Sequence, residues 1–103
     1  MPKKINWDGV ELETKNYVML YMSADPNLRT QRKMNLLPIY KFIKYKFDVS
    51  YPTAIAKVHE ILEADQRFKV EVFYPYWHNK ENHVSYMGPL VEIEKARTAF
   101  GLA

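Results

Sequence analysis

Two histidines near the end of the chain have the side chains and spacing from which a metal site could be built. His78 and His83 lie in a polar segment, with Glu81 between them. A catalytic metal site takes about three protein ligands in a fixed geometry, and this segment offers no further candidate. We therefore predict that the chain holds no metal. A metal-dependent nuclease using residues 78–83 remains the alternative.

The other residues with catalytic side chains form no recognisable centre. His59 and Glu60 begin the zinc-protease helix motif, but position 63 is Glu where the motif has a second His. Glu92 and Glu94 would share one face of a strand, where a solvated pair is the simpler interpretation. The chain has no cysteine, and its three glycines are scattered. Thiolate chemistry and a glycine-rich phosphate loop are therefore excluded, and we predict a protein without a cofactor that is not an enzyme.

The chemistry that the sequence favours is recognition of negative charge by a basic segment. Residues 29–57 contain seven basic residues and one acid, whereas acids outnumber bases on either side and the net charge is only +3. Such a concentration is typical of a surface that binds phosphates. Lysines that simply solvate one face of a helix are the alternative. The seven basic residues are Arg29, Arg32, Lys33, Lys41, Lys44, Lys46 and Lys57.

Length and composition limit the class of protein that can position these residues. A chain of 103 residues with 48% hydrophobic residues has room for one domain with one core. Its first residues lack the apolar centre of a secretory signal, and no apolar stretch is long enough to cross a bilayer. The sequence thus predicts a soluble, cytoplasmic protein of one domain, residues 1–103, without a membrane partner.

The first part of the chain predicts one helix and a long connection. Apolar residues at helical spacing predict the helix over residues 9–22, with Asp8 as its cap. A strand over residues 17–22 is the alternative, because β-branched and aromatic residues are frequent there. Residues 23–33 are polar and contain Asp25-Pro26-Asn27, which indicates a turn within a long connection.

Two further helices are expected to carry most of the basic segment. The second begins near Asn35, and Lys41 and Lys44 fall beside its apolar stripe. After the break at residues 48–50, Ser50 can cap a third helix that ends near residue 64. The side chains expected to face solvent on the third helix are Tyr51, Thr53, Lys57 and Glu60.

The end of the chain predicts a β-hairpin. From residue 67 polar and apolar residues alternate, as in a half-buried strand that continues into an aromatic run at residues 73–77. Residues 78–83 are expected to form a polar tip, and residues 84–87 the returning strand. Residues 90–93 resume the strand briefly, and residues 94–100 form a short closing helix. The expected fold class is therefore α+β, with three helices followed by a hairpin.

This order of elements resembles a winged-helix domain, which is a helix-turn-helix followed by a β-hairpin, the wing. The resemblance is carried by the helices over residues 36–47 and 51–64, the turn at 48–50, and the hairpin over 67–87. It covers about half of the chain. That family also has a short strand between its first two helices, and the sequence shows none there.

The resemblance implies a small protein that binds double-stranded DNA, such as a transcriptional regulator. The third helix would enter the major groove with Tyr51, Thr53 and Lys57 near base edges. Lys80, near the tip of the wing, would touch the minor groove or the backbone. The residues implied as phosphate contacts are Lys41, Lys44 and Lys46, joined by Arg29, Arg32 and Lys33 if the segment before the second helix folds alongside.

An aromatic cluster in the hairpin supports a different function. Exposed aromatic residues form hot spots in protein interfaces, so the chain could instead be an adaptor or inhibitor, of the kind that phages encode to modulate their hosts. Such a patch would also support a homodimer. Packing of alternate rings into the core is the simpler alternative. The cluster consists of Phe73, Tyr74, Tyr76, Trp77 and Tyr86, and the residues predicted to bind a protein are Tyr74, Tyr76, Trp77 and Tyr86.

Overall fold

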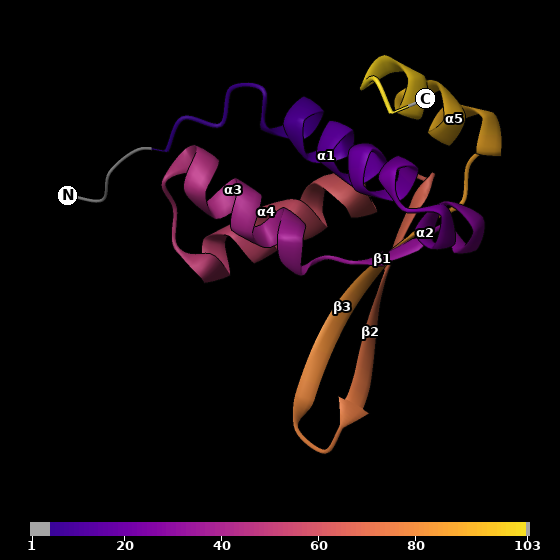
Figure 1. Ribbon diagram of the computed structural model, residues 1–103. Coiled ribbons are helices and arrows are strands. Elements are labelled where there is room, and N and C mark those ends of the chain that lie inside the picture. The colour runs from indigo at the N-terminus through magenta and orange to yellow at the C-terminus, as the bar shows by residue number, and fades with distance from the viewer. Residues whose placement is uncertain (1–4, 103) are drawn as a thin grey trace.

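In the computed structural model, residues 5–102 are described, and they fold into a group of helices packed at the base of a small antiparallel sheet (Figure 1). The elements are α1 (Val10–Ala24), α2 (Pro26–Gln31), β1 (Lys33–Asn35), α3 (Leu37–Phe47), α4 (Tyr51–Glu63), β2 (Phe68–Tyr76), β3 (Asn79–Tyr86) and α5 (Leu90–Ala99). The expected α+β class is confirmed. The expected order of three helices followed by a hairpin is not matched, because α2 and β1 separate α1 from α3. The closing helix expected over residues 94–100 is present as α5 and begins earlier, at Leu90. None of the helices within residues 5–102 is long and apolar enough to span a membrane.

Local backbone interactions set the ends of α3 and α4, although Leu36, the N-cap of α3, makes no side-chain cap bond. The side-chain oxygen of Asn35 accepts a hydrogen bond of 2.8 Å from the backbone N–H of Leu37, at the start of α3. Asp48 adopts a left-handed conformation with φ of 53°, which ends α3 and turns the chain sharply. Ser50 caps α4 by accepting a bond from the backbone N–H of Thr53. The helix pair predicted from the sequence is therefore present, with a short turn between its helices.

The connection expected over residues 23–33 contains a helix and a strand. The Asp25 carboxylate accepts a hydrogen bond of 2.8 Å from the backbone N–H of Asn27, and Pro26 occupies the first turn, so the supposed turn signal is a helix cap. Helix α2 is six residues long, too short to show a hydrophobic period. The start of α1 also differs, because Gly9 rather than Asp8 is its N-cap.

The sheet has the strand order β1-β3-β2, with both pairs antiparallel. Val84 in β3 lies between Met34 of β1 and Val70 of β2, and this pairing over a long sequence distance defines the short strand β1. The turn of the hairpin is at residues 77–78, so most of the expected polar tip belongs to β3. Residues 90–93 form the first turn of α5 instead of a strand, since Pro89 precedes them as the N-cap.

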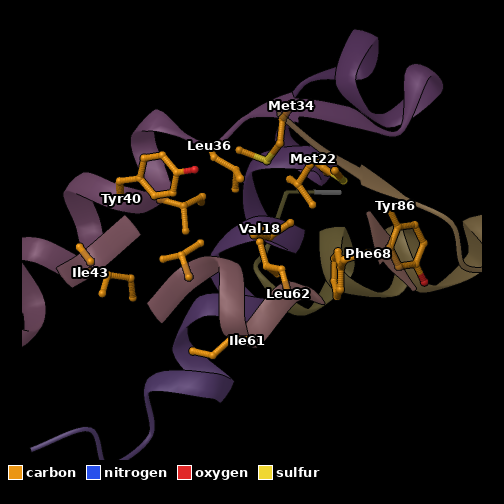
Figure 2. Close-up of a cluster of buried hydrophobic side chains, with 14 of the residues drawn as sticks. Val18, Met22, Met34, Leu36, Tyr40, Ile43, Ile61, Leu62, Phe68 and Tyr86 are labelled. Carbon is orange, nitrogen blue, oxygen red and sulfur yellow. The ribbon is translucent and has the colours of Figure 1, made fainter. Parts of the chain in front are cut away.

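The core lies where α1, α3 and α4 meet the base of the sheet (Figure 2). The side chains of Val18, Ile43, Leu62 and Val84 are completely buried, and they come from three helices and the central strand. Figure 1 shows α5 lying along α1, while the hairpin extends away from the helices on the other side. Packing thus fixes α3, α4 and the base of the hairpin relative to one another.

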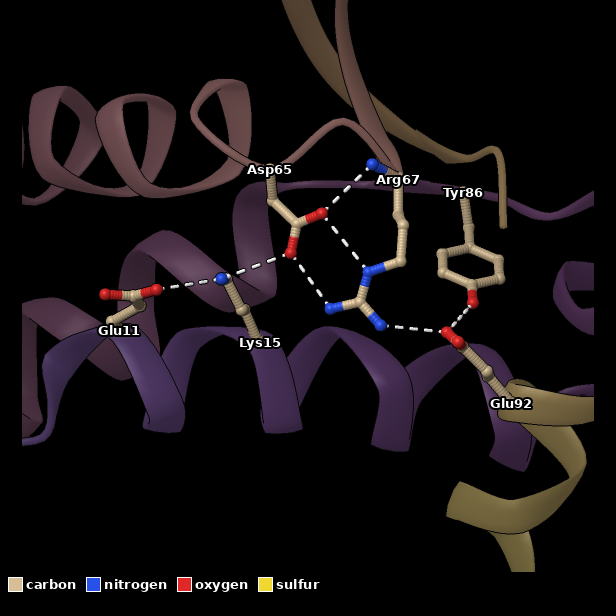
Figure 3. Close-up of polar contacts among 6 residues, drawn as sticks. All are labelled: Glu11, Lys15, Asp65, Arg67, Tyr86 and Glu92. Carbon is tan, nitrogen blue, oxygen red and sulfur yellow. Dashed lines mark hydrogen bonds and ion pairs between the residues drawn. The ribbon is translucent and has the colours of Figure 1, made fainter. Parts of the chain in front are cut away.

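A polar network holds α5 and the α4–β2 turn together (Figure 3). The Arg67 guanidinium donates bonds to both carboxylate oxygens of Asp65, and its Nη1 donates a bond of 2.8 Å to Glu92 in α5. The same Glu92 oxygen accepts the hydroxyl of Tyr86, and Lys15 of α1 lies 3.1 Å from Asp65. Hydrogen bonding from Arg67 holds the pKa of Asp65 well below its usual range. Burial raises the pKa of Tyr86 to about 12.

Candidate nucleic-acid interface

A groove of about 360 Å³ lies where the start of α3, the N-terminal half of α4 and the middle of the hairpin meet. Tyr51 and Lys80, predicted as contacts from distant parts of the sequence, both line it. They are brought together because β3 pairs with β1, which leads directly into α3. The complete lining is Asn35, Leu37, Tyr40, Tyr51, Ile55, Lys80, Glu81 and Asn82.

The floor of this groove is polar. The hydroxyl of Tyr40 is hydrogen-bonded to Nε2 of His59. Burial, partly opposed by a hydrogen bond with Asn82, raises the pKa of Tyr40 to about 12. Burial is also the main cause that lowers the pKa of His59. The charge of Glu63 partly opposes this shift, and the charge of Lys80 lowers the pKa further. At neutral pH both rings are therefore mainly uncharged.

Asn82 gives the groove an acceptor that sequence reasoning missed. The amide group of its side chain acts on Tyr40, whereas its side-chain oxygen is buried and accepts no hydrogen bond within residues 5–102. A buried carbonyl oxygen without a partner is unfavourable. An isolated Asn in a polar hairpin carries no sequence signal, so only the folded arrangement identifies this atom.

The lysines of α3 and the hairpin differ in how far acids neutralise them. Lys41 and Lys80 are exposed and form no ion pair among the residues that the structure describes. Lys44 also has no acidic partner there, and its ammonium lies 4.6 Å from the ring centre of Tyr45. Lys46 lies 4.0 Å from a carboxylate oxygen of α1. Three of these lysines are therefore available to an anionic partner.

Three other predicted phosphate contacts are engaged elsewhere in the fold. Arg29 lies 3.1 Å from Glu94 of α5, and Arg32 donates a bond of 3.0 Å to the carbonyl oxygen of Gly88. Lys33 lies 3.6 Å from a carboxylate of β2, on the sheet. These side chains stabilise the sheet and α5, and they do not line the groove. The segment that carries Arg29, Arg32 and Lys33 therefore does not fold alongside the groove, which was the condition for their contact with the same phosphates.

Thr53 and Lys57 lie on the opposite flank of α4 from Tyr51. They line a second, shallow groove of about 450 Å³ together with Trp7 from the segment that precedes α1. The Lys57 ammonium lies 3.4 Å from Glu60 and 5.4 Å from the ring centre of Trp7. The Thr53 hydroxyl accepts a bond of 2.8 Å from Ser50 and so belongs to the helix cap.

The aromatic cluster of the hairpin is divided between surface and core. Tyr74, Tyr76 and Trp77 are 71%, 72% and 90% exposed, as an interaction surface requires. Tyr86 is only 1% exposed, and its hydroxyl is bonded to Glu92. The expectation that Tyr86 belongs to an exposed protein-binding cluster is therefore wrong, because its side chain points to the core beside Phe68.

The histidines of the hairpin lie against aromatic rings. The His78 ring packs edge-on against Trp77 at 5.3 Å, and the His83 ring lies 4.8 Å from Phe73. His83 also lies 3.3 Å from Glu81. Across residues 5–102, no three His, Asp or Glu side chains are grouped closely enough to hold a metal ion.

A wider groove of about 690 Å³ between α1 and α3 was not predicted from the sequence. Tyr17 and Phe42 stack within it with ring centres 3.9 Å apart, and Lys41 is among its lining residues.

Comparisons of the chain with protein-family models, with curated proteins and with solved structures find no match.

Proposed function

We propose that the protein binds double-stranded DNA with α3, the N-terminal half of α4 and the hairpin. The observation that carries this proposal is that the start of α4 and the hairpin flank one groove, in which Tyr51 and Lys80 lie together. The major groove of B-DNA, about 12 Å wide, admits one α-helix. A helix and a projecting hairpin on the same side of a protein can contact neighbouring grooves of a duplex at the same time.

The order of the elements supports a winged-helix domain. Helices α1, α3 and α4 surround the core, and a turn of three residues joins α3 to α4. Strand β1, which the sequence did not reveal, lies between α1 and α3 in the chain and pairs with β3 of the hairpin. This is the position of the short strand in the winged-helix family.

The charges along α4 limit how it would approach DNA. Glu60 and Glu63 are exposed in its second half, where they would repel phosphates. The first half carries no acid, so on this proposal Tyr51 and its neighbours approach base edges. Lys41, Lys44 and Lys80 would neutralise phosphates on either side. The biological role that this predicts is regulation of transcription by occupancy of a DNA site.

Fluorescence anisotropy of a labelled mixed-sequence duplex at several salt concentrations tests the proposal. We expect the logarithm of affinity to fall with the logarithm of salt, with a slope of about −0.9 for each neutralised phosphate. The double variant Lys41→Glu/Lys80→Glu should bind at least tenfold more weakly and with a shallower slope. Lys95→Glu on α5 is the control for a reversed surface charge and should bind as the native protein does. Absence of binding at low salt would contradict the proposal.

The exposed rings of Tyr74, Tyr76 and Trp77 favour a second candidate function, that of a protein-binding adaptor or inhibitor. On that proposal a partner protein would cover these rings, and the lysines would contribute only at its rim. The Lys41→Glu/Lys80→Glu variant would then keep its function, and Tyr76→Ala/Trp77→Ala would lose it.

A further inference from the structure

The outer end of the hairpin, residues 72–79, forms an arm that projects beyond the helices, whereas Lys80 and Glu81 line the groove with α3 and α4. Every residue of the arm is exposed, and Figure 1 shows the hairpin extending away from the rest of the molecule. Its base is anchored because Phe68, Val84 and Tyr86 are buried in the core. The tip is thus the part of the fold that can reach furthest into a partner.

The two strands of the arm are paired on both sides of an irregularity. Val72 pairs with Asn82 and Phe73 with Glu81, the register then shifts as at a β-bulge, and Tyr76 pairs with Asn79 next to the turn. On one face the Lys33 ammonium lies 3.6 Å from the ring centre of Phe73. A tip that is ordered before binding loses little conformational freedom when it enters a partner.

The tip is mainly aromatic and carries little positive charge, so it is poorly suited to contact phosphates alone. Trp77 is 90% exposed at the turn, and Tyr74 and Tyr76 stand beside it. Lys80 is the only lysine or arginine among residues 74–80, and no acid occurs there. Exposed clusters of large apolar side chains mark interaction sites, because water solvates them poorly. The occupant of this tip must therefore offer an apolar or aromatic slot close to negative charge.

We propose that the tip of the arm enters a groove of the bound duplex and that Trp77 inserts between two base pairs, so that the protein bends its DNA. The inference rests on the proposed function. Stacked bases offer an aromatic slot, and the phosphates beside it supply the negative charge that Lys80 would contact. Apolar side chains inserted at a base step kink DNA by about 20–90°. Pyrimidine–purine steps unstack most readily, so a TA step is the preferred site of insertion.

A duplex of about 30 base pairs with one central TA step and fluorophores at its two ends measures bending by energy transfer. A second copy with 2-aminopurine at the step reports unstacking. Native protein should raise both the energy transfer and the 2-aminopurine emission. Trp77→Ala should abolish both signals and weaken binding by about tenfold or more, which is the usual loss for a stacking aromatic residue. Phe100→Ala, which removes a partly exposed ring at the end of α5, is the control and should leave both signals unchanged.

Three results would overturn the inference. Binding without bending by the native protein refutes insertion and leaves the proposed function intact. The same holds if Trp77→Ala bends the duplex as the native protein does, in which case the tip is left for a partner protein. Failure of the native protein to bind any duplex at low salt refutes both proposals together. Circular dichroism of Trp77→Ala checks that the variant is folded, as the exposure of this ring leads us to expect.

Discussion

Gly88→Ala is the substitution for which the structure predicts the clearest loss of stability. A methyl group at this position would lie 2.6 Å from Cζ of Tyr86 and would collide with its hydroxyl oxygen. Ordinary contacts between carbon atoms are about 3.5–4.0 Å, so the ring must retreat by about 1 Å. The ring is buried and its hydroxyl is bonded to Glu92, so neither can move without loss.

The expected loss has two parts. Overpacking of a core costs about 1–3 kcal/mol. A hydrogen bond to a charged group contributes about 1.5–3 kcal/mol, and the lower end applies because the Glu92 side chain is 34% exposed. We therefore expect Gly88→Ala to lower the free energy of unfolding by about 3 kcal/mol and Tm by about 12 °C.

Urea denaturation and a thermal melt measure this loss, with Met87→Ala as the control. Met87 is 64% exposed, so its replacement should change stability by no more than about 0.5 kcal/mol. Repeating Gly88→Ala in the Tyr86→Phe background tests the cause, because that background has already lost the hydroxyl. The effect should then be smaller by at least about 1 kcal/mol. A loss below about 1 kcal/mol for Gly88→Ala, or equal losses in both backgrounds, would refute the reasoning.

Three further predictions concern the turn after α4, the cap of α4 and the groove. Hydrogen bonds from Arg67 lower the pKa of Asp65 in the folded state. The contribution of Asp65 to stability is therefore present above its unfolded pKa of about 4 and is lost as the pH falls below that value. In thermal melts at acid pH, the stability of Asp65→Asn should depend less on pH than that of the native protein. Ser50→Ala removes the cap of α4 and should cost about 1 kcal/mol in urea denaturation, whereas Ser50→Asp should restore most of it. In an NMR titration the pKa of His59 should lie below its ordinary value of 6.5, and Lys80→Ala should raise it. A His59 pKa unchanged by Lys80→Ala would contradict an electrostatic effect of Lys80 on this ring.

The helices that the sequence predicts well are those with both a hydrophobic period and a cap. Helix α4 has Ser50, Pro52 and a regular apolar stripe, and its observed bounds agree closely with the predicted ones. Helix α2 and strand β1 were missed because each is too short to show a period. Strand β1 exists through its pairing with β3, about fifty residues further along the chain, and local sequence carries no information about that pairing.

The candidate site could be predicted only as separate residues. The side-chain chemistry of Tyr51 and Lys80 predicted contact with nucleic acid for each residue separately. Their proximity in the fold depends on the register of the sheet, which the sequence did not reveal. The charge count of the basic segment does not show that Arg29 pairs with Glu94 of α5 and that Arg32 donates to the carbonyl oxygen of Gly88. Sequence charge counts treat all lysines and arginines alike, whereas the fold decides which of them keep their charge available.

Asn35 links the two surfaces that a duplex would touch. Its backbone pairs with His83 in the hairpin, and its side chain holds the first turn of α3. The helix pair and the arm consequently form one body with two contact surfaces, and the distance and angle between these surfaces are fixed. A partner bound to the helix pair meets the arm at a high effective concentration, and the reverse is also true. The translational and rotational entropy of association is therefore lost only once. Affinity should therefore depend steeply on the spacing between the two contact points on the partner, as it does for a chelating ligand.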